Sequence, residues 1–119
     1  MVRLIDPEIL DRYKRALADW RVEGAIELEG RAPEGLRTTV EGVTVQFFKE
    51  ALYRFVCEEG GEIDQVKEDR EPWRKFWECH YDLRLTVQGV PLYVETRLYP
   101  ESFTSNKDPT IRVVQVKPA

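Results

Sequence analysis

The sequence predicts one α+β domain spanning residues 1–119, with an antiparallel sheet of about four strands and helices packed on one face of that sheet. Three observations favour this fold. Two segments, within 6–20 and 39–60, carry apolar residues at helical spacing. The stretch 79–98 alternates apolar and polar residues on both sides of a turn. The last stretch, 111–117, is apolar at both alternating positions, which is typical of a strand inside a sheet.

The first helix is predicted to begin at Asp6, because an aspartate cap, a proline at the first helical position and an acid in the first turn follow one another there. Apolar residues then recur three and four positions apart, at Ile9, Leu10, Tyr13, Leu17 and Trp20. One face of this helix is therefore expected to pack on the rest of the domain.

The pattern changes to a period of two at 22–29, where Ile26 and Leu28 alternate with glutamates. This alternation predicts a strand, although the glutamate and alanine content leaves a helix as the alternative. The next segment, 31–37, contains Pro33 and Gly35 and is predicted to be a turn-rich connection.

The second helix is predicted to begin near Thr39 or Thr44 and to end at Gly60-Gly61, whose first glycine can take the left-handed conformation. We expect its apolar side to lie across the apolar face of the hairpin at 79–98. For 62–77 the sequence leaves an extended segment and a helical turn as alternatives, with a short helix that Pro72 could open.

The hairpin turns at Gln88-Gly89, because glycine supplies the positive φ that a two-residue turn needs. This turn sets the register. On one face it pairs Val87 with Val90, Leu85 with Leu92 and Leu83 with Val94. On the other side, which we call the polar face, it pairs Arg84 with Tyr93, Asp82 with Glu95 and His80 with Arg97.

Composition and charge disfavour several classes of protein. No apolar run approaches the ~18 residues of a membrane span, so the chain is expected to be cytoplasmic and to bind no membrane. The net charge of −4 disfavours nucleic-acid binding by the whole surface. One histidine, two cysteines and no C-x-x-C spacing predict no metal site, and no motif for a cofactor is present. The sequence leaves open the oligomeric state and a bond between Cys57 and Cys79.

The polar face is the first candidate site. Repulsion between Asp82 and Glu95 could raise the pKa of one carboxyl group. A titratable base, cations and a hydroxyl lie within reach, which is a set suited to acid–base chemistry on a phosphate or carbonyl. The candidate catalytic residues are His80, Arg84, Tyr93, Glu95, Arg97 and Lys117. The ordinary alternative is a solvated face on which arginines neutralise acids across strands.

The second candidate site is the segment 68–77, EDREPWRKFW, in which cationic and aromatic residues interleave. Such residues stack single-stranded bases and hold phosphates, so we name Arg70, Trp73, Arg74 and Lys75 as candidate contacts to RNA or to a partner. The alternative is that its tryptophans cap the core from a short helix. Phe103, in the polar loop 99–110, is a further candidate contact.

The succession LYVETRL, a loop and IRVVQVK resembles the end of small bacterial toxins of the RelE and MqsR type, which are messenger-RNA interferases built on a helix-covered antiparallel sheet. The resemblance implies that Tyr93 and Lys117 belong to the functional site. It further implies that Tyr93 positions groups or assists proton transfer, and that Lys117, Arg84 and Arg97 stabilise the scissile phosphate without a metal.

Two functions from different classes follow. The first is a non-enzymatic interaction or regulatory module with a protein partner, favoured by the lack of a strong catalytic motif, by Phe103 and by the acidic segment 58–71. The alternative is a metal-independent endoribonuclease that acts on single-stranded RNA with the polar face. A small-ligand binder is a third hypothesis, which rests on the aromatic content alone.

Overall fold

The structure, a computed structural model, describes residues 2–100 and 107–119, and within these residues the chain forms three α-helices and six strands. The helices are α1 (Pro7–Ala18), α2 (Ala32–Thr39) and α3 (Val45–Tyr53). The strands are β1 (Val2–Leu4), β2 (Ile26–Leu28), β3 (Ile63–Lys67), β4 (Cys79–Val87), β5 (Val90–Tyr99) and β6 (Thr110–Pro118). Two short turns complete the list, a π-helical turn η1 (Arg54–Glu58) and a 3₁₀ turn η2 (Trp73–Lys75).

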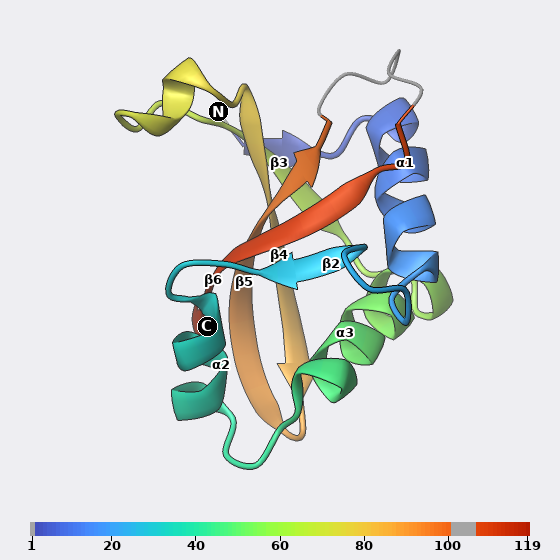
Figure 1. Cartoon of the computed structure of the whole chain (residues 1–119), viewed down its shortest axis with the longest axis vertical. Helices are drawn as coiled ribbons and strands as arrows, with labels where there is room; N and C mark the ends of the chain where they lie inside the picture. The colour runs from blue at the N-terminus through green and yellow to red at the C-terminus, as the bar shows by residue number, and fades with distance from the viewer. Residues whose placement is uncertain (1, 101–106) are drawn as a thin grey trace.

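All six strands form one sheet in the order β1-β3-β4-β5-β6-β2 (Figure 1). Neighbouring strands are antiparallel except β2 and β6, which are parallel. The α+β class is confirmed, but the prediction of about four antiparallel strands is wrong, since the sheet is mixed and larger. Strands β1 and β2 have three residues each, which is too short for alternation to reveal their pairing partners.

The predicted hairpin register is confirmed from Val87 opposite Val90 to Tyr81 opposite Thr96. The turn residues have positive φ, +50° at Gln88 and +79° at Gly89. Positive φ at both central positions gives the two-residue turn whose twist matches that of the flanking strands. The turn chemistry and the alternation therefore agree, and together they determine which residues lie on the polar face.

The helices cover the apolar face of the sheet, and α1 and α3 lie side by side (Figure 1). Tyr13, Phe48 and Leu52 are fully buried there, which confirms that the second helix packs on the apolar side of the hairpin. The hydroxyl of Tyr13 lies 2.7 Å from Oγ1 of Thr96, so even the polar atom of this core tyrosine has a partner. Within 2–100 and 107–119, no helix is long and apolar enough to cross a membrane.

Helix α2 corrects the prediction of a connection at 31–37. Pro33 lies in the first turn of the helix, where its missing N–H costs nothing. Gly35 lies against β6, because a Cβ built on it would be 2.2 Å from the carbonyl oxygen of Val116. The glycine therefore permits close packing of the helix on the sheet. The sequence suggested a turn because a glycine two residues after a proline is also typical of turns.

Three questions left open by the sequence are settled. The segment 22–29 contains a strand, β2, although a shorter one than predicted. Helix α3 is capped by Thr44, whose side chain accepts a 3.0 Å hydrogen bond from the backbone N–H of Phe47. Cys57 and Cys79, both among the described residues, are not joined by a disulfide.

The last strand lies between β5 and β2, as predicted for a strand inside the sheet. Its apolar residues lie on both faces, as predicted, but Val116 joins Ile111 and Val113 in the core, while Val114 lines a pocket with Glu95 and Arg97. A bulge opposite Glu95 and Thr96 leaves Val114 without a position in the register, so Ile111, Val113 and Val116 are all buried. The bulge returns β6 to a register that pairs Lys117 with Tyr93.

Candidate functional site

The polar face brings the six predicted catalytic residues onto one side of the sheet. Alternate positions of β4 and β5 supply five of them: His80, Arg84, Tyr93, Glu95 and Arg97. Lys117 joins them from β6 through its pairing with Tyr93. The hairpin register thus predicted which residues share this face.

Much of the polar face is buried, which the alternative of a solvated face did not predict. The relative exposures of His80, Asp82, Glu95 and Arg97 are 7%, 6%, 4% and 5%. The segment that follows β3 folds back over this end of the face, since its Arg70 bonds to Glu95 and its η2 turn lies against Arg97. Arg84 and Lys117, at the other end, are exposed.

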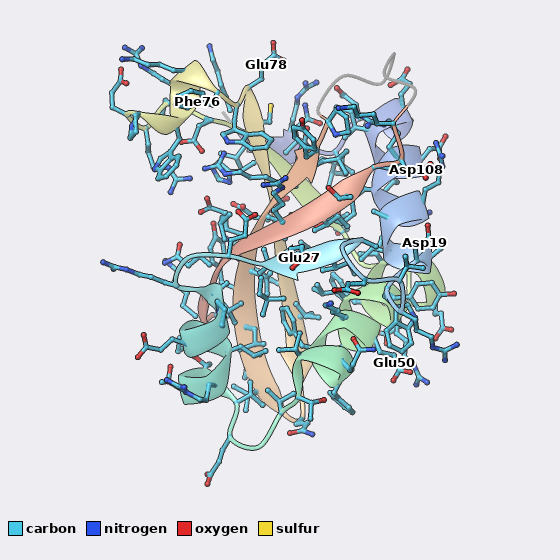
Figure 2. All side chains as sticks on the ribbon, viewed as in Figure 1. Asp19, Glu27, Glu50, Phe76, Glu78 and Asp108 are labelled. Carbon is cyan, nitrogen blue, oxygen red and sulfur yellow. The ribbon has the colours of Figure 1, made fainter. Side chains whose placement is uncertain are left out.

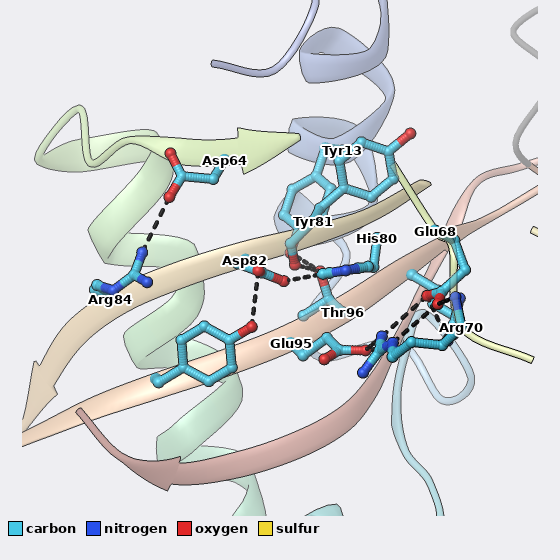
Figure 3. Close-up of polar contacts among 12 residues, drawn as sticks. Tyr13, Asp64, Glu68, Arg70, His80, Tyr81, Asp82, Arg84, Glu95 and Thr96 are labelled. Atoms are coloured by element: carbon cyan, nitrogen blue, oxygen red, sulfur yellow. Dashed lines mark hydrogen bonds and ion pairs between the residues drawn. The ribbon is translucent and has the colours of Figure 1, made fainter. Parts of the chain in front are cut away.

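Asp82 links Tyr93 and His80 in one chain of hydrogen bonds (Figure 3). The Tyr93 hydroxyl donates to Oδ2 of Asp82 at 2.7 Å, and Nδ1 of His80 lies 2.7 Å from Oδ1 of the same carboxylate. Burial raises the pKa of Tyr93, and the bond to Asp82 raises it further. The Tyr93 phenol is therefore protonated at neutral pH, and it releases its proton less readily than a free phenol does.

Two cations flank the ring of Tyr93. The guanidinium carbon of Arg84 lies 5.2 Å from the ring centroid, and Nζ of Lys117 lies 5.0 Å from it. Arg84 also pairs with Asp64 of β3 at 3.0 Å. A pocket of about 470 Å³ is lined by Asp64, Asp82 and Arg84. A ligand can therefore reach the Asp82 carboxylate beside a positive charge.

A second network joins Glu95 and Arg97 to residues that follow β3 (Figure 3). Arg70 donates to both oxygens of Glu68 at 2.9 Å and to Oε2 of Glu95 at 2.6 Å. Arg97 donates to Glu68 at 3.2 Å. Burial would raise the pKa of Glu68, but the hydrogen bonds from Arg70 and the charge of Arg97 outweigh burial and hold that pKa at about 2.

Glu68 is the residue of this network that the sequence did not single out. It lies in an acidic stretch, so nothing in the pattern distinguished it from solvated neighbours such as Asp69. Only the fold brings it to β5, where its side chain is fully buried. The burial of Glu68 depends on contacts with residues distant in the sequence, so no local sequence pattern distinguishes it from the exposed acids around it.

Among the described residues, one group has the geometry to hold a metal ion. Ligand atoms of Glu68, His80 and Glu95 all lie within 4.8 Å of one another, and the three side chains are buried. They come from three different segments, so ligand spacing along the chain could not reveal them. Arg70 bonds to both carboxylates, so both of these groups already have a cationic partner.

The η2 turn brings only part of the second candidate site to the polar face. The ring centroids of Trp73 and Trp77 lie 5.6 Å and 5.3 Å from the guanidinium carbon of Arg97, so these tryptophans do not cap the core. Arg74 instead pairs with Glu71 away from this contact, and Lys75 is exposed. Phe103 lies outside the described residues.

Comparisons with known protein families, curated proteins and solved structures find no match to this chain. The resemblance to RelE and MqsR toxins therefore stays a prediction. What the polar face can do must be argued from its own geometry.

Proposed function

We propose that the polar face binds single-stranded RNA and cleaves it without a metal ion. The observation that carries this proposal is the convergence at Tyr93, whose ring lies between two cations while its hydroxyl bonds to Asp82. Three kinds of group needed for phosphodiester cleavage, a base, an acid and cations, thus lie together.

The chemistry uses the 2′-hydroxyl of RNA as the nucleophile. Asp82 takes the proton of that hydroxyl as its oxygen attacks the phosphorus, and Tyr93 gives its proton to the leaving 5′ oxygen. Asp82 then returns a proton to the Tyr93 oxygen across their 2.7 Å bond. The products are a 2′,3′-cyclic phosphate and a free 5′-hydroxyl, so atoms and protons balance.

The surrounding residues have supporting roles. Arg84 and Lys117 stabilise the charge that develops on the phosphate oxygens. His80 orients Asp82 through the bond to its other oxygen. DNA is not a substrate in this scheme because it lacks the 2′-hydroxyl.

The test is incubation of end-labelled RNA with the purified protein in EDTA, beside DNA of the same sequence. We expect fragments from RNA only. Tyr93→Phe should lower the cleavage rate by about a hundredfold, which is the typical effect of removing a proton donor. Lys117→Ala should also lower the cleavage rate. Tyr99→Phe on the same strand and Lys14→Ala on α1 are matched controls. Intact RNA, or cleavage indifferent to Tyr93→Phe, overturns the proposal.

The interaction module is the second candidate, and exposed acidic side chains before and after β3 favour it. Within 58–71 five acidic side chains are exposed: Glu58, Glu59, Glu62, Asp69 and Glu71. The partner would carry a basic surface, so its binding should weaken as salt rises. Replacing Glu58, Glu59 and Glu62 by glutamine should abolish binding to an immobilised polylysine surface that the native chain binds.

A further inference from the structure

A second pocket lies on the polar face, under the segment that carries η2. Its volume is about 450 Å³, and Trp73, Trp77, Glu95 and Arg97 contribute to its walls. Gly30 and Val114, from the β2–α2 connection and the β6 bulge, complete the opposite side. Figure 2 shows Phe76 on the same projecting segment, where it is 71% exposed and does not line the pocket.

Arg97 in this pocket has one donor without a partner. The residue is 95% buried, since its relative exposure is 5%, and its Nη2 donates to Glu68. Its Nη1 is also buried, yet it has no hydrogen-bond partner among the described residues. A buried donor without an acceptor is costly and rare in folded proteins. Arg97 lines the pocket, so an acceptor on a ligand that reaches Nη1 would give this buried donor the partner it lacks.

The lining groups define the chemistry of such a ligand. The Arg97 guanidinium lies over both indole rings, and Trp73, which is 49% exposed, still offers a flat surface on which a planar ring can stack. Arginine donates to carbonyl oxygens and ring nitrogens, and the Glu95 carboxylate accepts from N–H groups. A bare phosphate has no N–H for Glu95 and no face for the tryptophans, and an aliphatic ligand would leave Nη1 of Arg97 without an acceptor. A nucleobase satisfies all three kinds of group.

We propose that this pocket binds one unpaired nucleobase. Tyr93, Glu95 and Arg97 are successive residues on the polar face of β5, so Tyr93 and Arg97 are roughly 13 Å apart along the strand. The base would thus belong to a nucleotide one or two positions from the cleaved bond. That assignment rests on the proposed RNA cleavage, whereas base binding itself can be measured without cleavage.

The experiment follows tryptophan fluorescence during titration with each of the four nucleoside 5′-monophosphates and with ribose 5-phosphate. A Trp20→Phe background leaves Trp73 and Trp77 as the two emitting tryptophans of the chain. We expect saturable quenching by at least one of the nucleotides and none by ribose 5-phosphate. Trp73 is 49% exposed, so Trp73→Ala should fold, and it should weaken binding at least tenfold.

Matched variants separate this inference from the proposed cleavage. Phe76→Ala should bind nucleotides as the parent does, since Phe76 lies outside the pocket. Tyr93→Phe should also keep nucleotide binding while losing cleavage. Base-dependent quenching without RNA cleavage supports the pocket and overturns the proposed cleavage alone. Cleavage accompanied by no base-dependent quenching, or by quenching that Trp73→Ala leaves intact, overturns the pocket alone.

Discussion

At the scale of single residues, the molecule contains a buried carboxylate whose charge depends on two arginines. The side chain of Glu68 is fully buried, while Arg70, one of its partners, is about half exposed at 48%. Solvent screens the exposed partner, so this ion pair contributes less than a fully buried one would. The contribution of this ion pair to the free energy of unfolding depends on pH, because the pKa of the carboxyl group differs between the folded and the unfolded chain.

The pKa of Glu68 predicts a loss of stability in acid. The ordinary value is 4.5 and the folded value is about 2, so the folded chain binds this proton less readily than the unfolded chain. The stabilisation is fully present above pH 4.5 and is lost as the pH falls toward 2. After allowance for screening, we expect a loss of about 2 kcal/mol in the free energy of unfolding.

Urea unfolding between pH 5 and pH 2 measures this loss. Glu68→Gln should be less stable than the native chain at neutral pH. Its free energy of unfolding should also change less steeply with pH across that range. The control is Glu34→Gln, an exposed acid whose pair with Arg37 is 3.8 Å long, and it should keep the native slope. Equal slopes for the native chain and Glu68→Gln would contradict the assignment.

Arg70 predicts a second effect, on metal binding. Arg70→Gln removes one of the two guanidinium groups that contact both Glu68 and Glu95, the other being that of Arg97. The two carboxylates then lie beside His80 with ligand atoms within 4.8 Å. Two carboxylates and one imidazole suit Mn²⁺ or Zn²⁺. We therefore expect Arg70→Gln to lower the melting temperature, and added metal to raise it again in this variant only. Arg74→Gln, which alters a surface pair, should behave as the native chain does.

At the scale of elements, the sequence predicted the helices and strands that are defined by a local pattern of residues. The hairpin follows from strict alternation around Gln88-Gly89. Helix α1 follows from Pro7 in its first turn and from its apolar stripe, although the Asp6 side chain makes no capping hydrogen bond. Helix α2 was missed because Gly35 is required by contact with Val116, a residue at the other end of the chain. The Glu68 network was missed for the same reason, since long-range contacts leave no periodic pattern.

Helix α2 provides the test of this argument. Gly35→Ala would raise helix propensity, which alone should stabilise the chain by up to about 1 kcal/mol. The new Cβ would lie 2.2 Å from a backbone oxygen of β6, and backbone cannot move aside as a flexible side chain can. We expect net destabilisation of about 1–3 kcal/mol by the scale of overpacked cores. Denaturant unfolding measures this change in stability, with Glu34→Ala, an exposed site on the same helix, as the control. If Gly35→Ala were more stable than the native chain, the close packing of α2 on β6 would be contradicted.

At the scale of the whole molecule, the two faces of the sheet have different roles. Among residues 2–100 and 107–119, three helices cover the apolar face, whereas the polar face is covered only at the end where the η2 turn lies. Figure 1 shows this turn projecting from the end of the sheet opposite the β4–β5 turn. The uncovered part, around Tyr93, therefore remains open to a large ligand while the far end is closed by side chains.

This arrangement predicts weak salt dependence of RNA binding. The net charge of −4 means that the surface as a whole repels phosphate, so binding must rely on the few cations near Tyr93. If Arg84 and Lys117 each neutralise one phosphate, the slope of log K against log salt for single-stranded RNA should be about −1.4. Fluorescence anisotropy measures this slope with a labelled oligonucleotide and Tyr93→Phe protein, which should cleave about a hundredfold more slowly. Lys117→Ala should reduce the slope by about 0.7, and Lys14→Ala should leave it unchanged. A slope steeper than about −4 would place the RNA on a broader basic surface than the polar face provides.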